Sequence, residues 1–360
     1  IGIPADSEFR VRAGLLHALN NAVEKTGNTY MPKGLLLNQA EDILELDQTS
    51  HKNLYDDALQ GLTLDKTVII MFREGYEIVV PSKYYFYENS VAQKLALLNC
   101  SQVIEKQDVD DEIKAFEEKN HIVFHEEQKN AIRNSVNSGV SVITGGPGTG
   151  KTTIIKCIID IVKQNNKKFM LLAPTGRASK RMSDSTGEEA KTIHRALEVA
   201  QGDLAHLSRF VYNENNPFKT DVVIVDEVSM VDVALMSHLC KALPRDCKLI
   251  LVGDKDQLPS VGAGNVLDDI LKSGIISVSM LTKIYRQNDD SLIITNAHLI
   301  NSGKMPLIDN TSKDFFFEEK TDLEGIKNSI VDMVVKRLPK YTGLDSYQIQ
   351  VLAPLKAGVC

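Results

Sequence analysis

The feature that most constrains this chain is a glycine-rich run between an apolar strand and an apolar helix. It reads Gly145-Gly146-Pro147-Gly148-Thr149-Gly150-Lys151-Thr152 and fits the pattern G-x-x-x-x-G-K-[ST]. Glycines let backbone N–H groups approach phosphate oxygens, and the helix N-terminus adds positive partial charge. Lys151 is expected to reach the β- and γ-phosphates, and Thr152 to ligate Mg²⁺. The predicted nucleotide-binding residues are Gly145, Gly146, Pro147, Gly148, Thr149, Gly150, Lys151, Thr152 and Thr153.

The chain around this run alternates short apolar strands with helical stretches such as Thr152–Val162. Strands buried on both faces by crossover helices predict an α/β fold with a parallel, doubly wound sheet. Functional groups of such sheets gather where the strands end at their carboxyl edge. The predicted strands are Val140–Thr144, Phe169–Ala173, Val222–Val225, Leu249–Val252 and Ile276–Leu281.

Two acids, Asp226 and Glu227, directly follow the apolar strand Val222–Val225. Two acids after a strand are often only a helix N-cap. Together with the phosphate-binding run upstream, they favour hydrolysis: Asp226 can hold Mg²⁺ through its water shell, and Glu227 can polarise the attacking water.

Two single residues follow the later strands. The amide of Gln257 can sense a γ-phosphate by donating one hydrogen bond and accepting another. Arg286 can supply a cation for charge developing on the transferred phosphoryl group, although a lone arginine more often forms a surface salt bridge. Each is a weak signal alone.

The first hundred residues predict a small mixed unit. Helical periodicity covers Arg10–Thr26, Lys33–Leu46 and Asn53–Leu62. The β-rich runs Thr67–Phe72 and Tyr76–Val80 follow, joined by a three-residue turn at Arg73, Glu74 and Gly75. This pattern is typical of a winged-helix-like domain, and a DNA contact and a plain packing role both stay open.

Residues 101–120 contain seven acids and three bases with few apolar side chains. Such a charge run predicts a solvated helix or linker, so we place a domain boundary there.

Composition limits the partners and the compartment. The net charge of −7 argues against a general polybasic nucleic-acid binder but leaves room for a local basic groove. Five scattered cysteines without a C-x-x-C pair indicate reduced thiols in a cytoplasmic protein. No apolar stretch is long enough for a membrane span, so no membrane partner is expected. The start lacks both Met and a signal-peptide pattern, so we expect a fragment of something longer.

The order of the motifs resembles that of superfamily 1B helicases, and most of all the RecD-like family, often named exodeoxyribonuclease V alpha subunit. The motifs are GGPGTGKTT, APTGRASKR, TIHR, VIVDEVSMVD, LVGDKDQLPSVGAG and YRQ. The segments Gly27–Pro32 and Tyr87–Ala92 are also similar to the amino-terminal region of the long, stand-alone RecD-like proteins. The resemblance implies a RecA-like P-loop NTPase sheet, ATP as the nucleotide, and Mg²⁺.

The resemblance also implies roles for single residues. Gln128 matches the glutamine that reads adenine, with a bidentate amide geometry. Arg177, Lys180 and Arg181 form a local basic cluster suited to phosphates, although a solvated helix face is the simpler alternative. The residues that match the family's contacts to single-stranded DNA are Thr175, Arg177, Thr192, His194 and Arg195. Residues 204–219 match the place of the strand-separating pin.

The chain stops at Val351–Cys360, where the family's second motor domain opens. The later motifs, including a second arginine, would lie beyond it, and no nuclease carboxylates are recognisable. The predicted parts are residues 1–104 as an amino-terminal domain, 105–120 as an acidic linker or helix, 121–284 as the first motor domain and 285–360 as the start of the second.

The resemblance implies an ATP-dependent DNA helicase of recombination and repair, travelling 5′ to 3′. Its partners would be single-stranded DNA, duplex junctions and other exodeoxyribonuclease V-type subunits. Residues 1–360 alone are expected to bind ATP weakly and to unwind little. An ATP-gated assembly module without translocation is the main alternative. A small-molecule kinase fits less well, because it needs neither the Gln128 segment nor the run from Gly253 to Ser260.

Overall fold

The computed structural model describes residues 2, 4–100, 108–200, 210–283 and 291–353. The chain forms two compact units, Ile1–Arg286 and Gln287–Cys360, and each is described by itself. No helix of the described residues is long and apolar enough to cross a membrane.

The first unit begins with three helices and a small antiparallel sheet. The helices are α1 (Glu8–Thr26), α2 (Lys33–Leu44) and α3 (Lys52–Leu64), and the strands are β1 (Met31–Pro32), β2 (Val68–Arg73) and β3 (Tyr76–Pro81). The sheet order is β1-β3-β2. Buried side chains such as Leu15, Leu19 and Leu59 form the core shared by the helices and the sheet. The three predicted helices and the hairpin are therefore confirmed.

The hairpin turn is shorter than its sequence predicts. Arg73 pairs with Tyr76, which leaves only Glu74 and Gly75 in the loop. Both have positive φ, 52° and 93°, as a two-residue type I′ turn requires. The predicted three-residue turn was wrong because Arg73 still belongs to the strand. The two-residue strand β1, paired through Met31 and Val79, was not predicted.

A long helix, α4 (Ser82–Cys100), follows β3 directly and was also not predicted. Its apolar residues Val91, Leu95 and Leu98 are buried in the core of the larger domain that follows. Lys94 donates from Nζ to the carbonyl oxygen of Leu243 at 2.6 Å, and Ser90 and Ser237 share a hydrogen bond of 2.8 Å. The helix thus joins the amino-terminal core to the larger domain.

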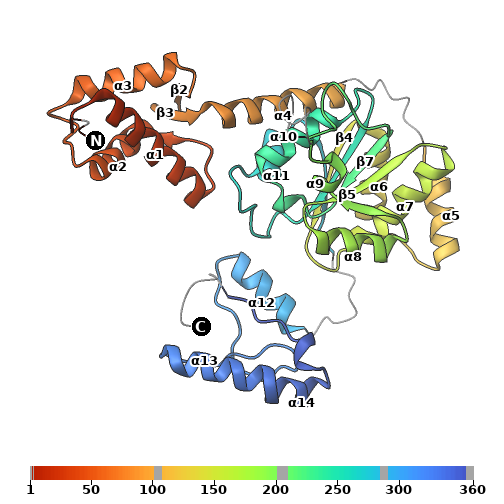
Figure 1. The fold of residues 1–360 in the computed structure, drawn as a ribbon. Coiled ribbons are helices and arrows are strands. Elements are labelled where there is room, and N and C mark those ends of the chain that lie inside the picture. The colour runs from red at the N-terminus through yellow and green to blue at the C-terminus, as the bar shows by residue number, and fades with distance from the viewer. Residues whose placement is uncertain (1, 3, 101–107, 201–209, 284–290, 354–360) are drawn as a thin grey trace. The chain divides into compact units, whose positions relative to one another are not determined.

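The larger domain is built on a six-stranded sheet in the order β6-β5-β7-β8-β4-β9, and every pairing is parallel (Figure 1). The five predicted strands are confirmed, with ends that differ by one residue at most. The sixth, β6, has only three half-buried residues and no apolar run, so periodicity could not find it. The strands are β4 (Val140–Gly145), β5 (Phe169–Ala173), β6 (Ala190–Thr192), β7 (Val222–Val225), β8 (Lys248–Gly253) and β9 (Ser277–Leu281).

Alternate residues of each central strand enter two separate cores. On one face, Val223 and Leu249 pack with α4, α9 (Ile193–Leu197), α10 (Val233–Ala242) and α11 (Val266–Ser273). On the other face, Ile224 and Ile250 pack with α5 (Asp110–Asn120), α6 (Glu126–Asn137), α7 (Lys151–Gln164) and α8 (Gly176–Thr186). Burial on both faces explains the unbroken apolar runs of these strands.

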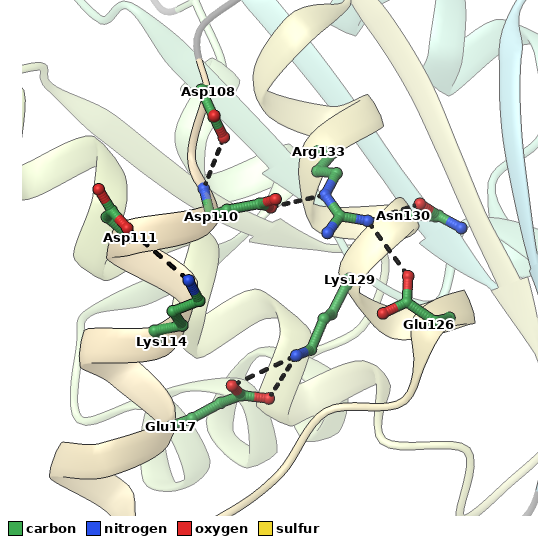
Figure 2. Close-up of polar contacts among 9 residues, drawn as sticks. All are labelled: Asp108, Asp110, Asp111, Lys114, Glu117, Glu126, Lys129, Asn130 and Arg133. Atoms are coloured by element: carbon green, nitrogen blue, oxygen red, sulfur yellow. Dashed lines mark hydrogen bonds and ion pairs between the residues drawn. The ribbon is translucent and has the colours of Figure 1, made fainter.

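The acidic stretch is a packed helix where the structure describes it, which corrects the expectation of a solvated segment. Ile113 and Phe116 of α5 are buried in the second core. The polar side of α5 pairs with α6: Asp110 with Arg133 at 2.7 Å, and Glu117 with Lys129 at 3.2 Å (Figure 2). Two of the acids therefore have specific basic partners on the neighbouring helix.

The second unit has little buried surface of its own. It contains α12 (Leu292–Asn301), α13 (Leu323–Asp332), the π-helix Met333–Arg337, α14 (Leu338–Thr342) and a 3₁₀ turn at Ser346–Gln348. Asn296 is the one fully buried side chain among its described residues, and its amide bonds both the N–H and the carbonyl of Leu307. Val351, Leu352 and Ala353 are not in a strand, and residues 354–360 lie outside the described residues.

The packing of α5 predicts the effect of Ile113→Ala. Removing a fully buried isoleucine leaves a cavity and should destabilise the first unit by about 3 kcal/mol. Glu118→Ala on the exposed side of the same helix should change stability by less than about 0.5 kcal/mol. Urea unfolding of both variants measures the difference, and equal stability would mean that α5 is a solvated linker after all.

Candidate functional site

The glycine-rich run forms a tight loop between β4 and α7. Gly150 caps α7 with a φ of 87°, a left-handed conformation that favours glycine. A Cβ at Gly150 would lie 2.3 Å from Nε2 of Gln128, and one at Gly145 would lie 2.7 Å from the carbonyl oxygen of Leu281. The loop is therefore packed closely against α6 on one side and the end of β9 on another.

Lys151 lies folded over this loop. Its ammonium group donates to the carbonyl oxygens of Gly145 and Gly146. Burial lowers the pKa of Lys151, and the carboxylates of Asp254, Asp226 and Glu227 oppose that shift. Three carboxylates at the carboxyl edge of the sheet thus stabilise the charge of one half-buried ammonium group.

The two acids after β7 occupy this edge as predicted from their position in the sequence. Oδ1 of Asp226 accepts the N–H of Glu227 at 2.9 Å, and Glu227 has a left-handed φ of 53°. Burial raises the pKa of Asp226. Burial and then Asp226 raise the pKa of Glu227, while Arg181 and Lys151 lower it. A carboxylate whose pKa is raised by its surroundings is a better proton acceptor.

Asp254 is a site acid that the sequence-based analysis did not single out. It follows β8 directly, and only 4% of its surface is exposed. Its backbone carbonyl accepts the N–H of Gln257, and the next residue, Lys255, donates its N–H to Oγ1 of Thr144 at 3.1 Å. The available signal was its position as the first acid after an apolar strand, which it shares with Asp226.

Gln257 lies exposed in the loop after β8, and its Oε1 accepts a long hydrogen bond of 3.5 Å from Ser229. This contact places it beside the segment that follows Glu227. Arg286 lies outside the described residues.

Gln128 is 6% exposed and supports the loop directly. Its Nε2 donates to the carbonyl oxygen of Thr149 at 3.0 Å, and its Oε1 accepts the N–H of His125 at 2.9 Å. Each end of an amide has two hydrogen-bonding positions, so one donor and one acceptor position remain beyond these contacts. The amide therefore holds the phosphate-binding loop, and its predicted pairing with adenine stays a prediction.

The same turn of α6 holds the end of β9. Glu127 accepts the N–H and the hydroxyl of Thr282 at 2.8 and 2.7 Å. Lys283 donates to the ring of His125 at 2.6 Å. The first turn of α6 therefore connects the phosphate-binding loop to the chain that leaves the sheet.

The five residues matched to DNA contacts lie at the carboxyl ends of two adjacent strands, β5 and β6, and in the helices α8 and α9 that follow them. β5 and β6 are parallel, with Ala173 opposite Thr192, so the segments that follow them start at the same edge of the sheet. Thr175 and Thr192 act as helix caps, accepting from the N–H of Ala178 and of Arg195. Arg177, His194 and Arg195 are exposed and form the solvent-facing part of this edge.

The described part of the predicted pin is a short turn. Asn213 and Asn216 bridge each other, and Phe210 is buried with its ring 4.9 Å from that of His238. Residues 204–209 lie outside the described residues, so the pin role stays a prediction.

The acids fit a hard cation such as Mg²⁺ in chemistry. Within the described residues, no group of three or more His, Cys, Asp or Glu side chains could hold a metal by itself. Mg²⁺ is usually held by one or two carboxylates together with phosphates and waters. Asp226 supplies one such carboxylate at the edge of the sheet, and the metal-binding roles of Asp226 and Thr152 stay predictions.

Comparison with known proteins agrees with this geometry. Residues 128–263 match the family model described as AAA domain. A 181-residue stretch is 38% identical to the ATP-dependent RecD2 DNA helicase of Deinococcus radiodurans, covering 50% of this chain and 24% of that protein. A 302-residue stretch is 29% identical to the RecBCD enzyme subunit RecD of Buchnera aphidicola, covering 68% of this chain and 48% of that protein. The chain thus spans about half the length of these relatives or less.

Among solved structures, the Pif1 helicase from Candida albicans is similar at 25% identity, with a TM-score of 0.43 over 64% of this chain and 56% of that one.

The sheet, the loop and the acids define a RecA-like P-loop α/β domain, within which residues 128–263 match the AAA domain model. Over part of its length the chain is also similar to proteins named RecD2 DNA helicase and RecBCD enzyme subunit RecD.

The support that Gln128 gives to the loop predicts the effect of Gln128→Ala. Loss of the bond to Thr149 should weaken binding of ATP and GTP alike, by about fivefold for one buried hydrogen bond. Any further loss for ATP alone measures adenine recognition. Titration calorimetry with both nucleotides separates the two terms, and unchanged affinity for both would contradict the loop-supporting role.

The raised pKa of Asp226 predicts a pH-dependent gain in stability from Asp226→Asn. Because burial raises this pKa above the unfolded value of 3.8, the ionised carboxylate destabilises the fold above the folded pKa and has no such effect below the unfolded pKa. Without nucleotide, Asp226→Asn should therefore raise Tm at pH 7 by about 3 °C, and by less as the pH falls toward 4. Asp42→Asn, at an exposed position, is the control, and thermal denaturation measures the Tm of both variants. A gain that grows as the pH falls would refute the assignment.

Proposed function

We propose that this chain is part of an ATP-dependent DNA helicase motor of the RecD type and contains its nucleotide-hydrolysing domain. The observation that carries the proposal is the convergence of Lys151, Asp226 and Glu227 at the carboxyl edge of one parallel sheet. The names of the similar proteins support DNA as the polymer along which the motor moves.

The nucleotide roles follow the residues of the site. The loop Gly145, Gly146, Pro147, Gly148, Thr149 and Gly150, with Thr152 and Thr153, surrounds the phosphates of ATP, and Gln128 faces its base. Lys151 turns from the loop carbonyls to the β- and γ-phosphates. Thr152 and Asp226 hold Mg²⁺, which neutralises charge on the phosphates.

Glu227 acts as the general base. It takes a proton from water, the water oxygen bonds to the γ-phosphorus, and the bond to the β–γ bridging oxygen breaks to leave ADP and phosphate. Gln257 senses the γ-phosphate, and Arg286 supplies a cation for the developing charge.

The DNA roles fall on the segments after β5 and β6. Thr175, Arg177, Thr192, His194 and Arg195 contact single-stranded DNA, and residues 204–219 form the pin at duplex junctions. Residues 121–284 form the first motor domain and 285–360 the start of the second. Movement 5′ to 3′, a role in recombination and repair, and assembly with exodeoxyribonuclease V-type subunits follow from the resemblance. The buried thiols of Cys157, Cys240 and Cys247, none of them in a disulfide, fit a cytoplasmic protein.

Lys151→Ala tests this proposal. The loss of the cation facing the phosphates should lower ATP hydrolysis in the full-length protein by about 100-fold or more and abolish unwinding of a forked duplex. Lys156→Ala, an exposed lysine on the same helix, is the matched control. Unwinding at the normal rate by Lys151→Ala would disprove the assignment.

A second measurement separates a motor from an ATP-gated assembly module. A translocating motor predicts that oligothymidylate strongly stimulates ATP hydrolysis by the full-length protein. A gate does not require stimulation, so an unchanged rate would favour that alternative.

A further inference from the structure

One ion pair connects the general-base candidate to the predicted DNA-binding edge. Nη1 of Arg181 lies 3.6 Å from Oε1 of Glu227. Arg181 belongs to α8, the helix that also carries Arg177 of the predicted DNA contacts, whereas Glu227 follows β7. Neither the predicted site residues nor the motif comparison gave Arg181 a role at the nucleotide.

Arg181 is reachable by a second ligand while it holds Glu227. Its side chain is 71% exposed, against 18% for Glu227. Arg177 lies four residues earlier on α8, so the two guanidinium groups project from the same face of the helix. A DNA phosphate that meets Arg177 therefore passes within reach of Arg181.

We propose that Arg181 is a positioning residue that holds Glu227 in the absence of DNA and releases it when a DNA phosphate takes the guanidinium group. The proposal rests on the hydrolytic and DNA-binding roles given above and adds the regulation of that site. It explains how a DNA strand that binds at the edge of the sheet can stimulate ATP hydrolysis at the nucleotide site.

The surroundings of Glu227 make Arg181 the adjustable partner. The charged groups acting on its carboxylate are Asp226, Arg181, Lys151 and Asp254. Lys151 is half-buried and bonded to the loop carbonyls, and the two acids follow buried strands. Arg181 alone among these four has most of its surface in solvent.

Release changes the position of the carboxylate. The backbone of Glu227 is fixed in a left-handed conformation, so freeing the carboxylate turns the side chain only. A phosphate is a good competitor because guanidinium binds it in a bidentate geometry.

Arg181→Ala in the full-length protein tests the proposal. An exposed ion pair stabilises the held position of Glu227 by at most about 1 kcal/mol. Its removal should therefore raise the rate of DNA-free ATP hydrolysis by about fivefold. The stimulation by saturating oligothymidylate should fall by the same factor, and Arg181→Lys should lie between the variant and the wild type. Circular dichroism checks the fold, which an exposed side chain should not disturb.

Lys163→Ala is the matched control. It also removes an exposed cation that pairs with a carboxylate, Glu188, but at the far end of α7, about 18 Å along the helix from Lys151. Its DNA-free rate and its stimulation by DNA should equal those of the wild type.

Two outcomes would overturn the proposal. An unchanged DNA-free rate with weaker DNA binding would make Arg181 a simple DNA contact. A fall in both rates would make it a cation acting directly on the phosphates. If the wild type hydrolyses no more ATP than Lys151→Ala, the proposed function itself fails, which is a distinguishable result.

Discussion

The site depends on the balance of charge at the carboxyl edge of the sheet, where three carboxylates lie near the half-buried ammonium group of Lys151. Lys151 loses hydration on burial, and Asp226, Glu227 and Asp254 offset part of that cost. The three carboxylates outnumber the ammonium group of Lys151, so this edge keeps negative charge that a divalent cation can balance. The parallel sheet supplies this arrangement, because β4, β7 and β8 are neighbours and end on the same side.

The first turn of α6 is the second point where separate parts of the site converge. Gln128 holds the phosphate-binding loop, and Glu127 holds the end of β9. The body of the same helix is fixed to α5 by Arg133 and Lys129 (Figure 2). Support for the loop thus extends through α6 to the acidic helix, which has no residue at the site.

The sequence predicted what depends on local pattern. Buried parallel strands are unbroken apolar runs, so Phe169–Ala173 and Val222–Val225 were located to the residue. The phosphate-binding loop was equally plain because its glycines are required by close approach at Gly145 and Gly150. Asp226 and Glu227 were found because two acids end a buried strand.

What depends on tertiary partners was not predicted. The apolar residues of α5 were outweighed by its charges, and the basic partners on α6 are not visible in a one-dimensional pattern. β6 is a strand only because β5 supplies its hydrogen bonds. Asp254 has the same kind of position as Asp226, but its burial is a property of the folded sheet. The pairing of Arg181 with Glu227 joins residues 46 positions apart and follows from the adjacency of β5 and β7.

The helix α4 limits where the amino-terminal core can bend against the sheet. From Val91 to Leu98 its apolar side is part of the first core of the larger domain, and a continuous hydrogen-bonded helix offers no joint within that length. Tyr84 and Tyr87 extend this packing into the first turns of α4. A second contact lies outside α4, where the carbonyl oxygen of Gly27 accepts the N–H of Gly264 at 2.8 Å. The amino-terminal core is therefore tied to the larger domain at two separate places.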